Sequence, residues 1–301
     1  GDKDQNGYTA LMIACMTGLT EVAALLVGKE AAVGDKDEDG ITALMFACEN
    51  GHTEVAALLV DKGAAVGDKD PYGYTDLMFA CENGHTEVAA LLVDKGAPVG
   101  DKDPYGQSAL MWACKKGHTE VAALLVDKGA AMGDKDQNGS TDLMFACENG
   151  HTEVAALLVG KGADMGDKTK SGRTALMYAC GNGHTEVAAL LVGKGAAMGD
   201  KTQEGYTALM IACFYFHTEV AALLVGKGAP VGDKGPNGST ALMFACMEGH
   251  TEVAALLVDK GAAMGDKDQW GRTALMIACE KGHTEVAALL VGKEAAVGDK
   301  D

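Results

Sequence analysis

Residues 34–66 read "GDKDEDGITALMFACENGHTEVAALLVDKGAAV", and this 33-residue unit recurs along the chain without insertion or deletion. The tripeptide "GDK" opens each of nine copies and also the short segment that ends the sequence. A fixed period of this length predicts a repeat architecture, in which each copy covers the apolar face of its neighbour. We therefore expect one array over residues 1–301, with copies at 1–33, 34–66, 67–99, 100–132, 133–165, 166–198, 199–231, 232–264 and 265–297 and a stub at 298–301.

The first half of each copy predicts a turn followed by a helix. The segment "DPYG" at 70–73 places Asp, Pro and Gly at the positions that a type I turn favours. Thr42 stands before an apolar run and is expected to cap the helix N-terminus. Two copies place an aspartate directly after this threonine, Asp76 and Asp142, where the helix dipole favours an anion.

The second half of each copy predicts a loop and another helix. Gly51 is expected to stop the first helix in the left-handed conformation. The segment "HTEVAALLV" then opens a second helix, with Thr53 as its expected N-cap and Gly63 as its expected stop. The sequence therefore predicts an all-α chain of turn–helix–loop–helix units.

Composition narrows the class of protein. The net charge of −18 argues against a nucleic-acid partner, which would need a basic stripe. The sequence contains no run of 18 apolar residues for a membrane span and no visible signal peptide.

Each copy carries one cysteine, and packed helices would hold equivalent residues about 8–10 Å apart, too far for disulfides. Nine free thiols in a core column fit a reducing, cytoplasmic location, with a soft-metal site of Cys15 and Met12 types as the alternative.

The pattern D-x-x-G-x-T-x-L, followed by two helices joined through Gly-His, resembles the ankyrin repeat over all nine copies. The T-P-L-H motif of that family is here "TALM" or "TDLM", and once "SALM", so Met12 and its equivalents cannot form the hydrogen bonds of the family's histidine. The resemblance implies a gently curved solenoid whose turns and first helices line a concave, partner-binding face. It also implies a loop-structural role for the eight histidines, His52, His85, His118, His151, His184, His217, His250 and His283.

Variation between the copies gathers in a few columns, where a column is a position from 1 to 33 within a copy. The segment "TEVAALLV" is the same in all nine copies, whereas columns 5, 6, 8, 13, 16 and 17 differ. Column 13 holds only Ile, Phe, Trp or Tyr and is expected to be a core site. The other five columns match the positions through which the resembling family contacts partners. Neutral drift is the alternative, although sites such as Glu21 and Lys29, also expected to be exposed, do not vary.

Tyr, Trp and Arg dominate binding hot spots, and they gather in these variable columns. The segment "FYF" at 214–216 adds two aromatic residues in columns 16 and 17, and its Phe216 replaces the left-handed glycine at a cost of about 1 kcal/mol. The strongest patch is expected to join Tyr206, Phe214 and Tyr215 with Arg173 and Trp270. The candidate partner-binding residues are Tyr8, Tyr72, Tyr74, Tyr105, Arg173, Tyr206, Phe214, Tyr215, Phe216, Trp270 and Arg272.

Catalysis needs a unique constellation, whereas the histidines of this chain repeat in near-identical contexts. We expect no catalytic residues, no metal site and no cofactor. The turn "DKDEDG" at 35–40 matches the start of a calcium loop, but Phe46 stands where that loop needs a bidentate Glu. The turn requirement explains the same residues, with calcium as the alternative.

The expected function is a non-catalytic protein-interaction scaffold, whose partner presents a basic or apolar face to the acidic chain. The alternative is a self-assembling structural protein. Alanines such as Ala24 and Ala57 would form an apolar stripe along the second helices, and the terminal copies lack polar caps. Association could then run end to end or along that stripe. The near-identity of the copies also resembles a consensus-designed or recently duplicated array.

Overall fold

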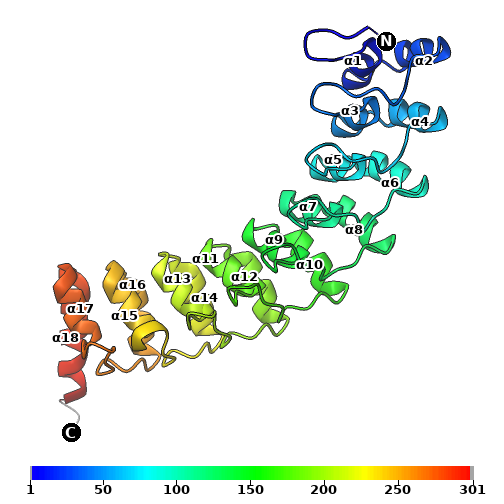
Figure 1. The fold of residues 1–301 in the computed structure, drawn as a ribbon. Helices are drawn as coiled ribbons and strands as arrows, with labels where there is room; N and C mark the ends of the chain where they lie inside the picture. The colour runs from blue at the N-terminus through cyan, green and yellow to red at the C-terminus, as the bar shows by residue number, and fades with distance from the viewer. Residues whose placement is uncertain (1, 299–301) are drawn as a thin grey trace. The chain divides into compact units, whose positions relative to one another are not determined.

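The computed structural model describes residues 2–298, and within that range the chain is helical, with two short helices in every copy (Figure 1). The described residues form no β-strand, only isolated bridges such as Lys36 to Thr42 across a turn. The first helices are α1 (Ala10–Met16), α3 (Ala43–Glu49), α5 (Asp76–Glu82), α7 (Ala109–Lys116), α9 (Asp142–Glu148), α11 (Ala175–Gly181), α13 (Ala208–Phe214), α15 (Ala241–Glu248) and α17 (Ala274–Lys281). The second helices are α2 (Thr20–Gly28), α4 (Thr53–Asp61), α6 (Thr86–Asp94), α8 (Thr119–Asp127), α10 (Thr152–Gly160), α12 (Thr185–Gly193), α14 (Thr218–Gly226), α16 (Thr251–Asp259) and α18 (Thr284–Gly298). One 3₁₀ turn, η1 (Pro236–Gly238), replaces the ordinary turn of the eighth copy. Residues 299–301 of the expected stub lie outside the described residues.

The chain forms two compact units, Gly1–Ala146 and Cys147–Asp301. Inside each unit, first helices pack against the second helix of their own copy and against the first helix of the next copy, as α3 does with α4 and α5. The second helices likewise pack on one another. Each unit is therefore two layers of helices in which a copy contacts only its neighbours, as expected for stacked repeats.

The cap and turn predictions for the first helix are confirmed. The Thr42 hydroxyl accepts a hydrogen bond from the Met45 N–H at 3.2 Å, and equivalent caps recur in other copies. In the turn before it, the Gly73 N–H donates to the Asp70 carbonyl at 3.0 Å. The Asp70 carboxylate also accepts from the Tyr74 N–H at 2.8 Å, so this side chain holds the turn closed.

The predicted N-cap of the second helix is wrong. Helix α4 begins at Thr53 itself, and the residue in the cap position, His52, forms no side-chain cap hydrogen bond. The reason lies in the preceding turn, where the Thr53 N–H donates to the Gly51 carbonyl at 3.0 Å and brings the threonine into the first helical position. The predicted stop is confirmed, because Gly63 follows the helix with a φ of 90°.

The core of each unit comes mainly from columns that do not vary, together with the apolar column 13. Methionines of column 12 in the first eight copies, such as Met45 and Met78, are fully buried, so the residue that replaces the family's histidine fills the core there. All nine cysteines are free, and eight are buried, as expected for a core column. Column 13 is buried in most copies, including Phe46 and Phe244, whereas Ile13 in the first copy is exposed.

Lysines of column 3 connect successive turns. The Lys69 ammonium lies 3.3 Å from the Asp101 carboxylate and donates to the Lys102 carbonyl at 3.3 Å. Lys102 in turn pairs with Asp134 at 3.0 Å. Lysine side chains therefore make the turn-to-turn contacts that a methionine in the "TALM" motif cannot provide.

Candidate partner-binding surface

Three aromatic side chains in column 6 project from the tips of the turns. Tyr72, Tyr105 and Trp270 are exposed to 66%, 65% and 60%. The carboxylate of column 4 holds each tip, since the N–H groups of Tyr72 and Tyr105 donate to Asp70 and Asp103 at 2.9 Å and 2.8 Å. Large apolar surface is thus displayed on turns whose backbone is fixed by hydrogen bonds.

The tyrosines of column 8 have a structural contact that the sequence did not indicate. Each packs against the column 13 aromatic ring of the following copy. The ring centroids are 5.5 Å apart for Tyr8 and Phe46, 5.3 Å for Tyr74 and Trp112, and 5.6 Å for Tyr206 and Phe244. These tyrosines are half-buried, and burial raises the pKa of Tyr74. Tyr8, Tyr74 and Tyr206 therefore help to join copies as well as border the turn surface.

Arg272, also in column 8, is held by two carboxylates. Its Nε donates to the Asp268 carboxylate at 2.9 Å, and its Nη1 donates to Glu280 at 2.9 Å. The guanidinium lies 4.8 Å from the centroid of the Trp270 ring. Burial alone would raise the pKa of Asp268, but the hydrogen bonds from Arg272 lower it. Two carboxylates of its own copy thus neutralise the positive charge of Arg272.

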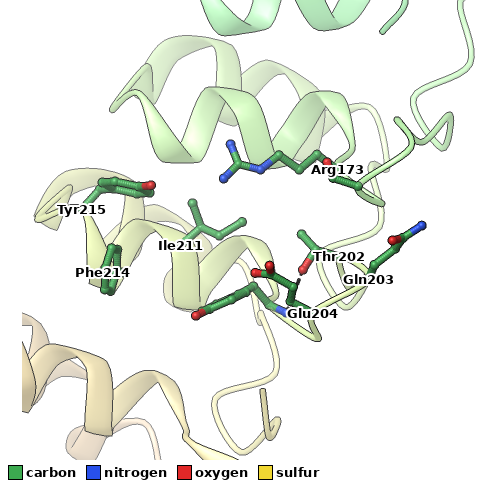
Figure 2. A pocket seen from close by; sticks show the side chains of 9 residues that line it. Arg173, Thr202, Gln203, Glu204, Ile211, Phe214 and Tyr215 are labelled. Carbon is green, nitrogen blue, oxygen red and sulfur yellow. Dashed lines mark hydrogen bonds between the residues drawn. The ribbon is translucent and has the colours of Figure 1, made fainter. Parts of the chain in front are cut away.

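Four of the predicted residues meet at one cavity. A hollow of about 300 Å³ lies at the junction of the sixth and seventh copies, and Arg173, Tyr206, Phe214 and Tyr215 line it (Figure 2). Trp270 is not among the lining residues, so the structure does not bring it into this patch. That these residues bind a partner stays a prediction.

The remaining walls of the cavity were not predicted. They are Ser171, Thr202, Gln203, Glu204 and Ile211. A signal was present, since Ile211 is smaller than the aromatic residue that column 13 holds in the neighbouring copies. Column 16 of the sixth copy is a glycine, Gly181, where a Cβ would approach Ile211 Cγ2 to 3.2 Å. Two reductions in side-chain volume thus coincide at this junction, but only the stacking of the copies brings them together.

Phe216 keeps the left-handed backbone of the glycine that it replaces, with a φ of 66°. In other copies, a Cβ in column 18 would collide with the histidine of the next copy; at Gly51, for example, it would lie 2.5 Å from His85 Nδ1. Phe216 instead packs its ring 3.9 Å from the His250 ring, centroid to centroid. The side chain is itself 63% exposed.

The histidines of column 19 have the structural role that the resemblance implied. His85 Nε2 lies 2.9 Å from the Glu49 carbonyl, and His184 Nε2 lies 3.0 Å from the Glu148 carbonyl, in each case at the end of the preceding first helix. His250 is different, because both of its ring nitrogens are buried without a hydrogen-bond partner. Burial lowers its pKa, an effect that His283 adds to and Glu248 opposes. Phe216 has displaced this one histidine from the repeated contact.

Among residues 2–298, no group of three or more His, Cys, Asp or Glu side chains is arranged to hold a metal ion. The column 4 carboxylates that resembled calcium ligands, such as Asp37, accept backbone N–H bonds within their turns. In the same range, the structure contains no helix with the length and apolar character that crossing a bilayer requires.

The sequence matches a family model described as "Ankyrin repeats (3 copies)" over residues 1–70, 77–169, 143–234 and 222–301. Among solved structures, it is similar to the crystal structure of the human ASB11 ankyrin repeat domain. The sequences are 24% identical, the TM-score is 0.69, and the match covers 74% of this chain and 99% of that chain. This likeness shows the fold alone. A comparison with curated proteins found no match.

Proposed function

Because the chain belongs to the ankyrin-repeat family, we propose that it is a non-catalytic scaffold that binds a protein partner through its turns and first helices. From the resemblance to ankyrin repeats, we expect the face formed by the turns and first helices to be concave. The partner is expected to present a basic or apolar surface to a chain of net charge −18. Its free, mostly buried thiols support a reducing location such as the cytoplasm.

The observation that carries this proposal is the contrast between a constant framework and exposed aromatic residues. The segment "TEVAALLV" never changes, yet column 6 alternates between residues such as Asn6 and the exposed Tyr72, Tyr105 and Trp270. Exposing such side chains has no folding benefit, whereas Tyr and Trp supply large contact area at an interface. Rigid scaffolds carry function on such variable positions.

The test compares three forms of the chain as baits in extracts of the source cells. One variant carries Tyr72→Asn, Tyr105→Asn and Trp270→Asn, which installs the residue that column 6 already holds in Asn6, Asn138 and Asn237. We expect wild type to retain a discrete partner and this variant to lose it. A control with Glu54→Ala and Glu87→Ala, both exposed on second helices, should keep it. Retention by the turn variant and loss by the helix variant would place binding on the other face and refute the proposal.

A second candidate, end-to-end self-association, is favoured by the terminal copies. Val22 and Leu25 in the first copy and Met276 and Val291 in the last are exposed, although Val55 and Met45, in the columns of Val22 and Met276, are buried in the second copy. The first copy of a second chain would offer the last copy nearly the same surface that covers an internal copy. Side-by-side association along the alanine stripe of the second helices has less support, because Ala57, Ala90 and Ala123 are half-buried. Light scattering that shows a constant mass over a wide concentration range would exclude both forms.

A further inference from the structure

The cavity at the junction of the sixth and seventh copies combines the Arg173 guanidinium with apolar and aromatic walls. We propose that it is an anchor site for a peptide of the protein partner, in which one acidic side chain stands beside an apolar or aromatic one. This inference rests on the proposed function: the partner surface as a whole would be basic or apolar, and this anchor would be its one acidic contact. Arg173 would bind the carboxylate, and Ile211, Phe214 and Tyr215 would contact the apolar group.

The first argument is that Arg173 lacks the carboxylates that hold its counterpart. Arg272 occupies the same column and pairs with Asp268 in column 4 and Glu280 in column 16. In the sixth copy those two columns hold Thr169 and Gly181. The Arg173 guanidinium forms no ion pair with a described residue, and its one charge contact is with the Tyr178 ring, 5.7 Å from the centroid.

The second argument is the space that Arg173 faces. At three other junctions a column 8 tyrosine fills the corresponding position by packing on a column 13 ring, as Tyr74 does on Trp112. Here Arg173 faces the smaller Ile211, and a hollow of about 300 Å³ remains. That volume is at the lower limit of ligand pockets and suits one or two side chains rather than a long segment.

The third argument is the arrangement of charge and apolar surface. Figure 2 shows the Arg173 side chain extending over Ile211 toward Tyr215, with Glu204 on the other side of Ile211. A guanidinium binds a carboxylate through two parallel hydrogen bonds, which makes it selective for that group. Phe214 and Tyr215 contact each other edge to face at 5.1 Å and form an aromatic wall. Glu204 would repel a second acidic group, so the site favours a single acid over an acidic run.

The test begins with a phage-displayed library of random peptides selected on the full wild-type chain. Synthetic peptides that match the enriched sequences are then measured by calorimetry. The expected consensus is one Asp or Glu beside an apolar residue. Thr169→Asp supplies the carboxylate that holds Arg272 in the ninth copy, and Ile211→Phe fills the hollow with a residue that column 13 accepts elsewhere. Each should weaken binding at least about tenfold.

Both variants use residues that other copies already carry, so folding should be preserved, and circular dichroism checks this. Lys194→Gln, which removes an exposed positive charge just after α12 in the same copy, is the matched control and should leave binding unchanged. Peptides that lack an acid, or that bind Thr169→Asp as well as wild type, would overturn the anchor while leaving a general scaffold function intact. If wild type enriches no peptide at all, the anchor fails, and the extract experiment with the three asparagines in column 6 decides the scaffold proposal separately.

Discussion

Phe216 shows how one residue can change a contact in the next copy. Left-handed backbone is costly for a residue with a Cβ, and its ring takes the place that the His250 imidazole would need to reach the preceding helix. The result is a buried histidine whose nitrogens have no partner. The aromatic surface of the seventh copy is therefore accompanied by the loss of the histidine-to-helix hydrogen bond that is seen at other junctions.

Replacing Phe216 with glycine should stabilise the chain. Glycine relieves the left-handed strain, about 1 kcal/mol, and lets His250 form its hydrogen bond, worth about 1–3 kcal/mol for a buried group. Glu30→Gly is the control, because Glu30 also has a positive φ, of 65°, at a position where equivalent glycines such as Gly63 face open space. We expect a larger rise in the thermal midpoint for Phe216→Gly than for Glu30→Gly. An equal or smaller rise would mean that the missing hydrogen bond of His250 does not destabilise the wild-type protein.

At the scale of helices, two first helices begin with a buried carboxylate. Asp76 opens α5 and accepts from the Gly67 N–H at 3.1 Å, while Asp142 opens α9 and accepts from the Gly133 N–H at 3.1 Å. Gly67 and Gly133 have φ values of 87° and 99°, whereas no other glycine of column 1 has a positive φ among the described residues. The aspartate thus reorients the glycine that opens its copy.

These two helix starts predict a pH dependence. Burial, partly offset by the glycine N–H bonds, raises the pKa of both Asp76 and Asp142 from 3.8 to about 6. The folded state therefore binds more protons than the unfolded state between pH 3.8 and about 6. The contribution of these groups to the free energy of unfolding falls as pH rises through that window.

Asp76→Ala with Asp142→Ala installs the residue of the other seven copies and should flatten this dependence. We expect a gain of about 1–3 kcal/mol in the free energy of unfolding at pH 7, measured by urea titration at several pH values. Glu87→Gln, an exposed change on α6, is the control. A variant that loses stability at pH 7, or that keeps the wild-type slope, would contradict the assignment.

The sequence predicted most of what depends on a single copy and missed side-chain contacts that depend on two. The threonine caps, the glycine stops and the buried column 13 follow from propensity and period inside the repeat. The packing of Tyr74 on Trp112 and the hollow above Ile211 depend on side chains from adjacent copies. The start of the second helix was misplaced because the Thr53 N–H is taken by the turn at Gly51, which no cap preference describes.

At the scale of the whole molecule, the nine cysteines of one column differ in burial. Cysteines in the first eight copies are buried, and burial raises the pKa of Cys15, Cys147, Cys213 and Cys246 to about 12. Cys279, in the last copy, is exposed. Since the thiolate is the reactive form, the nine thiols should differ sharply in rate.

We expect one thiol per chain to react rapidly with Ellman's reagent in the folded protein, and all nine after denaturation. Cys279→Ala should abolish the rapid phase, whereas Cys147→Ala should not. Protection of Cys279 at high protein concentration would support end-to-end association. Several rapid thiols at low concentration would contradict the buried core column.

The nearest-neighbour packing has a consequence for how such a chain changes over generations. Because the helical framework is nearly uniform, losing or gaining one 33-residue unit keeps the fold while creating a new pair of adjacent copies. Removing residues 199–231 would put Arg173 next to Phe244 and close the hollow in a single recombination event. A binding site in this chain thus depends on which two copies are adjacent. Unequal recombination between copies can therefore remove or create a site without changing any codon.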